Sequence, residues 1–490
     1  MASIDGLVTG MSTTDTINQL MQIEAAPQTA LKNKITTANK VVTAYQSVNS
    51  RLSSLASAAT ALGNASVWGA MKATASSDAA VVSAQAGASA GSISFRVDQL
   101  AATHVLTFGT KRVSSADAEV VPTDPGTGKG IVELRNSDGL VKTLEAKDGK
   151  LGSVVAAVNA DSSLPYTAAA VQIGSGEYAL QLTAKASGQK AADDMTAAGL
   201  PELTGDPIPS ITTQGRNARI SVGMDSAYEI ESATNTFADI LPGVTVTAAR
   251  QQAAGDAPVT ATVAADTDGI AAKVKALVDN ANVVLNEIAS QSKGMTDTTA
   301  AGPLVGDSAM RKLSQDILAA VASGVPHLGA NDGTASYNDV GVTVDRSGAL
   351  AFDEAKFRKA YAEDPARTQK YFDSYTDRTT ADGKGTTGTF EPGFDTADGL
   401  GRKLQTLALV ASEGVVDPTD PTKPKQGTLQ SLIQRRNEVI RGLNDEVGQW
   451  DVRLESRRSA LQLQFSNLEV ALGKMKQQSS WLAGQLAGLS

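Results

Sequence analysis

The chain has 490 residues, which is too many for one compact core, so we expect several domains. It contains no cysteine, which excludes disulfide bonds, thiolate metal sites and thiol catalysis. The net charge is -9 and the lysines and arginines form no block, so the concentrated positive charge that nucleic-acid binding requires is missing. Aromatic residues make up only 4% of the chain, which favours thin cores stabilised by elongated or oligomeric packing.

The sequence carries no recognisable membrane or secretion signal. It starts with Met-Ala-Ser-Ile-Asp-Gly-Leu-Val, which has neither the basic region nor the apolar region of a secretory signal peptide. No apolar run approaches the ~18 residues of a membrane span. We therefore expect a cytoplasmic protein, or one that is exported by a route without such a signal.

The N-terminal region has the periodicity of helices. A short helix should begin at Ser12, with Asp15 three residues on as a cap partner, and should end at a break at Pro27. Gly63 and Asn64 should stop the helix that follows. Between them, alternating steps of three and four residues predict a coiled-coil seam of Leu31, Lys34, Ala38, Val41, Tyr45, Val48, Leu52, Leu55, Ala59 and Leu62.

The C-terminal region mirrors this pattern after a linker that contains Pro418, Pro421 and Pro424. About sixty residues at ~1.5 Å each predict a rod of roughly 90 Å, which needs partners along its length. Phe465 and Leu472 lie beside the seam and widen it, which indicates more than one neighbouring helix. The seam consists of Leu429, Ile433, Arg436, Ile440, Leu443, Val447, Trp450, Leu454, Arg457, Leu461, Gln464, Leu468, Ala471, Met475, Gln478, Leu482, Gln485 and Leu489.

Four residues of this C-terminal helix have two interpretations each. Arg436 and Arg457 either pair across helices and set their register or extend their charged ends into water. Trp450 and Trp481 either anchor an interface or belong to the core of a local bundle. The position of Trp481 near the end of the helix favours the interface.

The middle of the chain alternates with the period of β-strands. Asp-Gly turns at Asp138 and Asp148 separate some of these segments. Residues 111–211 hold the most turn-rich sequence and look like an insertion into the flanking β segments. The expected strands are 79–86, 91–99, 131–135, 178–183, 219–222 and 243–249.

Helical periodicity returns from Ile270 to Ile288 and again after Asp307. A hairpin over residues 341–352 should then lead into one helix that is capped by Asp353. We expect that single helix to carry Phe357, Tyr361, Tyr371 and Phe372. These mixed elements should join the inner parts of the terminal helices in one domain.

The predicted fold is therefore an α+β multidomain protein. It has long N- and C-terminal coiled-coil helices, a mixed α/β inner domain and two nested β-rich outer domains. The expected parts are an N-terminal leg (1–42), an inner coiled-coil domain (43–75 with 266–452), a β-rich plate domain (76–110 with 212–265), an inserted β-rich outer domain (111–211) and a C-terminal leg (453–490).

One motif looks catalytic. Gly87-Ala88-Ser89-Ala90-Gly91 matches the Gly-x-Ser-x-Gly elbow of α/β-hydrolases, but residues 92–97 alternate like a strand where the elbow needs a helix. His104 and His327 are the only histidines, and neither stands in a recognisable triad. We interpret the motif as a hairpin turn.

Four other loops resemble ligand sites only in part. Residues 126–130 and 383–385 are rich in glycine but lack the spacing of a phosphate-binding loop. Residues 266–269 and 345–348 start like calcium loops but lack their remaining ligands. We therefore expect no catalytic residue, no cofactor and no metal ion, and we interpret the chain as a structural protein rather than an enzyme.

Both ends of the chain resemble the bacterial flagellar filament-cap family, also called hook-associated protein 2. At the start the resemblance lies in residues 3–11 and in Ile17, Leu20, Met21, Glu24 and Pro27. At the end it lies in residues 464–469, Met475, 478–482 and 485–486. Residues 235–247, 306–311 and 340–353 are also similar to this family, whereas 111–211 show no specific resemblance.

The resemblance implies a structural role in flagellum assembly and motility. Such proteins are exported unfolded by the flagellar type III system without a cleaved signal peptide, form a ring at the extracellular filament tip and promote insertion of flagellin beneath it. The implied partners are further copies of the chain, flagellin, an export chaperone at the C-terminal helix and, through the outer domains, host surfaces. Adhesion depends on residues 111–211, where the family pattern is missing.

Two alternatives remain at this stage. One is another axial flagellar protein, either flagellin or a junction protein, and the other is a surface adhesin. The residues that we expect to contact partners during assembly are Ile17, Leu20, Met21, Leu31, Leu461, Phe465, Leu468, Leu472, Met475, Trp481, Leu482 and Leu486.

Overall fold

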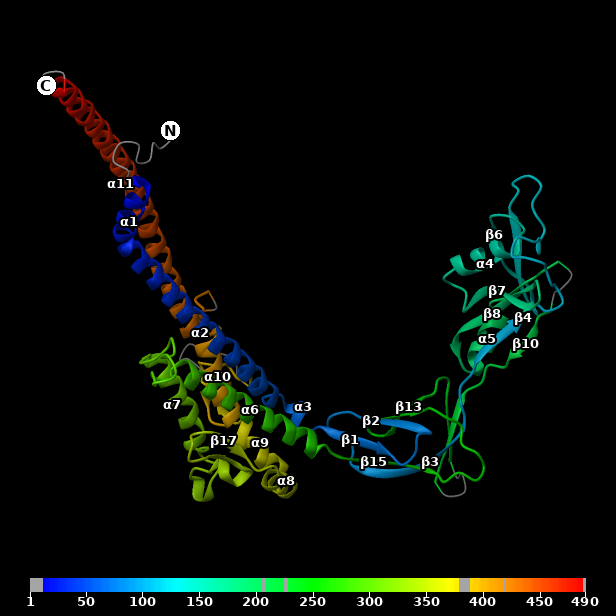
Figure 1. Ribbon diagram of the computed structural model, residues 1–490. Coiled ribbons are helices and arrows are strands. Elements are labelled where there is room, and N and C mark those ends of the chain that lie inside the picture. The colour runs from blue at the N-terminus through cyan, green and yellow to red at the C-terminus, as the bar shows by residue number, and fades with distance from the viewer. Residues whose placement is uncertain are drawn as a thin grey trace. The chain divides into compact units, whose positions relative to one another are not determined.

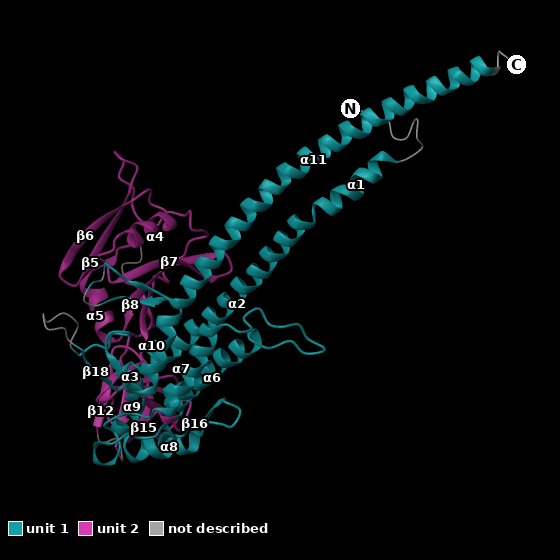
Figure 2. Cartoon of the chain, turned by 90° about the vertical axis from the view of Figure 1, so that its left-hand side faces the viewer, with its two compact units in different colours: residues 1–68, 268–490 teal, residues 69–267 magenta. Residues whose placement is uncertain are grey.

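The computed structural model describes residues 12–204, 208–223, 228–378, 388–417, 420 and 422–487. The chain divides into two compact units, residues 1–68 with 268–490 and residues 69–267 (Figure 2). The first unit is mainly helical and the second is mainly β-sheet. The α+β multidomain fold with long terminal helices is therefore confirmed. The finer domain boundaries that we derived from the sequence remain a prediction.

The N-terminal helices of the first unit are α1 (Thr13–Glu24) and α2 (Ala26–Leu62). The side chain of Ser12 accepts a hydrogen bond from the main chain of Asp15 at 3.2 Å, as the sequence predicts. The break lies at Ala25 and not at Pro27, because Pro27 fits the first turn of α2, where its missing N–H costs no helical hydrogen bond. The residues that resemble the filament-cap start, 3–11, lie outside the described residues.

The C-terminal helix α11 (Thr428–Ala487) is 60 residues long, and it lies beside α2 and α1 before it extends beyond them (Figure 1). The seam of α2 is buried from Ala38 to Leu62, which agrees with the predicted heptads. Leu489 and the predicted linker positions Pro418 and Pro421 lie outside the described residues.

The rest of the first unit forms a helical core around the inner half of α2. Besides the short α3 (Ala65–Trp68), its helices are α6 (Thr267–Gln291), α7 (Ser308–Ala322) and α10 (Leu400–Ala411). Helix α10, which the sequence analysis missed, packs against α2 and α7. Asp307 caps α7 through hydrogen bonds from the main chain of Ala309 and Met310.

The predicted hairpin is present as β16 (Val342–Val344) and β17 (Leu350–Phe352). The single helix expected after it is wrong, because the chain forms α8 (Glu354–Glu363) and α9 (Pro365–Asp373). Pro365 occupies the first turn of α9, and Asp364 ends α8 and caps α9. The remaining short elements of this unit are η2 (Ala330–Asp332), η3 (Tyr337–Val340), β18 (Tyr375–Thr376), β19 (Thr396–Ala397), β20 (Gly414–Val415) and β21 (Lys425–Gln426).

The second unit contains a first β-sandwich with its own core, which includes Phe95, Val97, Ile220 and Val246. All strand pairs in it are antiparallel. One sheet has the order β1 (Met71–Ala75), β15 (Val259–Ala265), β3 (Gly91–Gln99), β11 (Ala218–Val222) and β12 (Tyr228–Ser232). The other has the order β13 (Thr236–Leu241), β14 (Val244–Ala248) and β2 (Ala80–Ala84).

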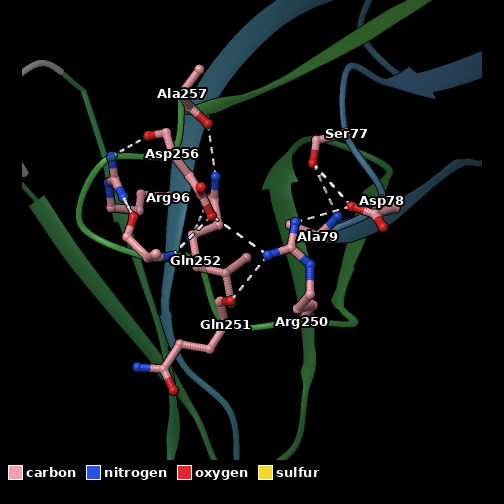
Figure 3. A network of polar contacts seen from close by, with 11 residues as sticks. Ser77, Asp78, Ala79, Arg96, Arg250, Gln251, Gln252, Asp256 and Ala257 are labelled. Atoms are coloured by element: carbon pink, nitrogen blue, oxygen red, sulfur yellow. Dashed lines mark hydrogen bonds and ion pairs between the residues drawn. The ribbon is translucent and has the colours of Figure 1, made fainter.

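A polar network holds the loop of residues 249–258 against this first sandwich (Figure 3). The guanidinium of Arg96 donates to two carbonyl groups of the loop at 2.7 and 2.5 Å. Gln252 is buried and accepts a hydrogen bond from a main-chain N–H of β3 at 3.0 Å. Arg250 and Asp78 form an exposed ion pair at 3.1 Å. The loop is thus fixed by polar contacts although it lacks regular structure.

A second core of the same unit is built largely from residues 106–203, including Phe108, Leu134 and Tyr166. One sheet has the order β10 (Ser210–Thr213), β4 (Thr103–Thr107), β8 (Glu177–Ser187) and β7 (Tyr166–Gly174). The other has the order β6 (Gly139–Ala146), β5 (Gly130–Asn136) and β9 (Leu200–Pro201). The helices α4 (Leu151–Ala160) and α5 (Gln189–Ala197) were not predicted, because a turn-rich sequence surrounds both.

Candidate assembly surface

The helical leg, which we define as residues 13–42 and 453–487, is an antiparallel pair of helices. The side chain of Gln28 donates to Asp451 at 2.5 Å, Arg457 pairs with Glu24 at 2.8 Å, and Arg458 donates to Asn18 at 3.0 Å. Residue numbers therefore rise along α11 while they fall along α2 and α1. This register sets the start of α1 against about residue 468 of α11.

Part of the predicted assembly set is covered by this helix pairing. Ile17 on α1 is 6% exposed and Leu461 on α11 is 7% exposed. Four others are half-buried, namely Met21, Leu31, Phe465 and Leu472. Leu472 lies just beyond the start of α1, so the covering by the helix pair applies to the other five residues.

The other predicted residues are exposed. Leu20 is 39% exposed, at the border of the pairing. Beyond the start of α1, α11 continues for roughly nineteen residues, or about 28 Å, without a described helix beside it. Its side chains there are 51–64% exposed, namely Leu468, Met475, Trp481, Leu482 and Leu486.

These positions belong to two apolar stripes on different sides of α11. The inner stripe continues the line that contacts α1 and consists of Leu461, Phe465, Leu468, Leu472, Met475, Leu482 and Leu486. The outer stripe lies on the opposite side and consists of Val452, Leu463, Val470 and Trp481, which are 56–68% exposed.

Sequence reasoning missed the first three residues of the outer stripe. They were overlooked because a heptad template searches for one seam, whereas these residues follow each other at 11, 7 and 11 positions. Each of these steps returns to nearly the same side of a helix with 100° per residue. A search for a second apolar face would have found them.

The charged seam residues differ in their surroundings. Arg457 pairs across helices with Glu24, and both side chains are at least one-third exposed, so the pair contributes little stability and mainly fixes register. Arg436 makes a hydrogen bond to the hydroxyl of Tyr45, and that hydroxyl donates to Asp307 at 2.5 Å. Burial, followed by the hydrogen bond to Asp307, raises the pKa of Tyr45 to about 12. Trp450 is half-buried beneath the guanidinium of Arg453, 5.3 Å from the ring centre.

The catalytic-looking residues do not converge in the described structure. Ser89 lies in the connection between β2 and β3, where its main-chain N–H donates to Pro242. His104 is buried and accepts a hydrogen bond from the main chain of Gly215, whereas His327 is exposed and pairs with Asp332. Neither histidine is hydrogen-bonded to Ser89.

Of the loops that resemble ligand sites, residues 126–130 and 345–348 contain turns, and residues 267–269 form the start of α6. In the loop of residues 345–348, hydrogen bonds from the side chain of Ser347 and from main-chain N–H groups lower the pKa of Asp345. The described part of the chain has no group of three or more possible metal-ligating side chains. None of its helices combines the length and apolar character of a membrane span. Residues 383–385 lie outside the described residues.

Comparison with known proteins identifies the family of this chain. Residues 9–104 match the family model described as flagellar hook-associated protein 2 N-terminus, and residues 215–477 match the one described as the C-terminus of the same protein. The chain belongs to the flagellar hook-associated protein 2 family. The resemblance that we drew from the two ends is thereby confirmed. The two models leave out the stretch between them, which contains the insertion without recognised resemblance.

Relatives in the hook-associated protein 2 family match most or all of the chain. The B-type flagellar hook-associated protein 2 of Pseudomonas aeruginosa is 24% identical over 522 residues, covering 100% of this chain and 98% of the relative. The flagellar hook-associated protein 2 of Escherichia coli K12 is 22% identical over 380 residues, covering 74% of this chain and 79% of the relative.

A solved structure shares the fold. It contains domains D1, D2 and D3 of the flagellar cap protein FliD from Escherichia coli. The TM-score is 0.51 at 20% sequence identity, with 75% of this chain and 96% of that chain covered.

Proposed function

We propose that copies of this chain form a ring at the tip of the flagellar filament and promote the polymerisation of flagellin beneath it. The observation that carries this proposal is the exposed apolar end of α11. The chain also belongs to a family that includes solved flagellar cap proteins. The ring supports motility because filament growth depends on it.

The partners in this proposal are helices. Burying an exposed leucine, methionine or tryptophan side chain contributes about 1.5–3 kcal/mol, and five such side chains lie beyond the start of α1. Two stripes on opposite sides of α11 allow contacts with flagellin on one side and with a neighbouring leg on the other. The leg thus recognises apolar helices through packing, and no covalent chemistry is involved.

Export and adhesion belong to the same proposal. The chain leaves the cell unfolded through the flagellar type III system, and an export chaperone covers the C-terminal helix before export. At the filament tip the second core, which lacks a family match, is the part that would touch a host surface.

The test places a charge on the inner stripe without shortening the helix. A double substitution, Leu468→Glu with Leu482→Glu, should stop filament growth and release flagellin into the medium, because two carboxylates oppose burial of the stripe. The matched control is Gln462→Glu with Ser480→Glu, which adds the same charges to exposed positions between the two stripes. Filament length by electron microscopy and flagellin in the medium are the readouts.

Deletions provide the stronger version of this test. Removing residues 1–40 or 465–490 should leave both units folded, as circular dichroism can show, while filaments no longer grow. Filaments of normal length in either deletion, or in the Leu468 and Leu482 variant, would refute the leg mechanism.

A further inference from the structure

His104 lies where the chain passes between the two cores of the second unit. Leu100 and Ala101 pack on the first core, and Leu106 belongs to the second core. On the return path, Ala102 and Arg216 form an antiparallel bridge with main-chain hydrogen bonds of 2.9 and 3.2 Å. Two paired strands therefore connect the cores, and His104 follows directly on one of them.

Between these strands the imidazole of His104 accepts a hydrogen bond in the place where a main-chain carbonyl would normally accept it. The side chain is 5% exposed, and its Nδ1 accepts a hydrogen bond from the N–H of Gly215 at 3.1 Å. Only a neutral imidazole without a proton on Nδ1 can accept this bond. The ring also makes a hydrogen bond to the main chain of Thr213. One side chain thus binds two points of the returning strand.

The packing leaves no space for a substitute at Gly215. A Cβ atom at this position would lie 2.9 Å from the carbonyl oxygen of Gly188 and 2.9 Å from Cβ of His104. The bond is buried, so water cannot replace the imidazole as acceptor without local opening.

The elements that pack against β4 are α5, β8 and the returning strand, and each of them carries charged groups. Burial lowers the pKa of His104, and this effect exceeds the opposing effects of the hydrogen bond to the main chain of Thr213 and of the charge of Asp193 on α5. Lys190 and Asp194, also on α5, pair with each other at 2.6 Å. Lys185 lies on β8, and the guanidinium of Arg216 donates to Leu100.

We propose that the hydrogen bonds of His104 hold the two connecting strands together and that protonation of its imidazole releases them. We call this contact the clasp. A proton on Nδ1 removes the acceptor of Gly215, leaves that N–H without a partner and places a positive charge in a buried site. Both effects favour opening of residues 213–217, because burial outweighs the hydrogen bond to Thr213, which favours the charged imidazole. Acid therefore loosens the attachment of the second core, while each core keeps its own packing.

The direction of the pH effect follows from the lowered pKa of His104. A group whose pKa is lower in the folded state stabilises that state fully above its ordinary value of about 6.5. This stabilisation is lost as the pH falls through the lowered value. Between the two values, the local opening equilibrium increases up to about tenfold per pH unit. Histidine is the side chain whose ordinary pKa lies in this range, and the chain has only two.

The experiment is hydrogen exchange with mass spectrometry on the full chain between pH 5 and pH 8, corrected for intrinsic exchange rates. We expect the protection of residues 213–217 to fall with acid, whereas β3 in the first core stays constant. In His104→Asn the amide oxygen takes the place of Nδ1 and does not titrate, so protection should not depend on pH. The control His327→Asn removes the exposed histidine and should behave like the unsubstituted chain.

The outcomes separate the clasp from a merely structural histidine. Protection that is independent of pH in the unsubstituted chain would overturn the proposal, and so would the same pH dependence in His104→Asn. If His104→Asn does not fold, the imidazole resonances of the unsubstituted chain decide. The imidazole signal that is still present in His327→Asn belongs to His104. Its pKa must lie below about 6.5. An ordinary titration would contradict the clasp.

Discussion

The two halves of α11 have the same kind of sequence but different surroundings. In the inner half, Leu429 is 1% exposed and the seam packs along α2. In the outer half, Leu468, Met475 and Leu482 repeat the same spacing but are more than half exposed. Apolar spacing in a helix therefore does not tell whether the surface that it marks is covered within the same chain.

The largest expected contrast compares one leucine from the paired region with one from the exposed end. Leu52 on α2 is fully buried, so Leu52→Ala should lower the free energy of unfolding of the first unit by about 2–5 kcal/mol. Leu482→Ala should change it by less than about 0.5 kcal/mol, because about half of that side chain is already exposed. Denaturant unfolding measures both. Equal losses would mean that Leu482 is packed within the free chain.

An intermediate effect is expected at Tyr45, which links α2 to the cap of α7. Tyr45→Phe removes the hydroxyl that donates to Asp307, so unfolding should become easier by about 1–3 kcal/mol. The pKa of Tyr45 is raised from 10.0 to about 12, so its stabilising effect is complete below pH 10 and is lost as the pH rises towards 12. Stability curves from pH 8 to pH 12 should therefore be steeper for the unsubstituted chain, and parallel curves would disprove this role.

The smallest effect is expected for the ion pair of the leg. Because Arg457 and Glu24 are both partly exposed, their coupling energy should be about 0.2–1 kcal/mol and should decrease with salt. A double-mutant cycle with Arg457→Ala and Glu24→Ala measures it. A coupling above about 2 kcal/mol, insensitive to salt, would show that the leg is packed more tightly than these contacts indicate.

The sequence predicted the long helices well because heptads repeat over many turns. The prediction failed at helix boundaries that depend on a single proline. Pro27 and Pro365 can each end a helix or start one, and only the local fold selects between these roles. Helix α4 was missed although Leu151, Val154 and Val158 are spaced for one apolar face.

The assembly residues remain a prediction, and the sequence did not divide them into those covered within the chain and those exposed. Ile17 on α1 and Leu461 on α11 are buried where these two helices pack together, whereas Leu468 and Leu482 on the same α11 are exposed. Trp481 was interpreted as an interface residue from its position near the end of the helix, and the structure places it on the outer stripe. The partner itself remains a proposal, because no pattern within one chain specifies a second chain.

Covering of the inner stripe at the filament tip can be measured directly, because the chain has no cysteine and accepts single cysteines as probes. Leu482→Cys should react with a maleimide in the free protein, where Leu482 is 52% exposed, and should be protected at least tenfold in caps on filaments. Leu52→Cys, a buried position, should react slowly in both. Equal reactivity of Cys at position 482 in free and filament-bound protein would contradict the claim that α11 binds its partners through this stripe.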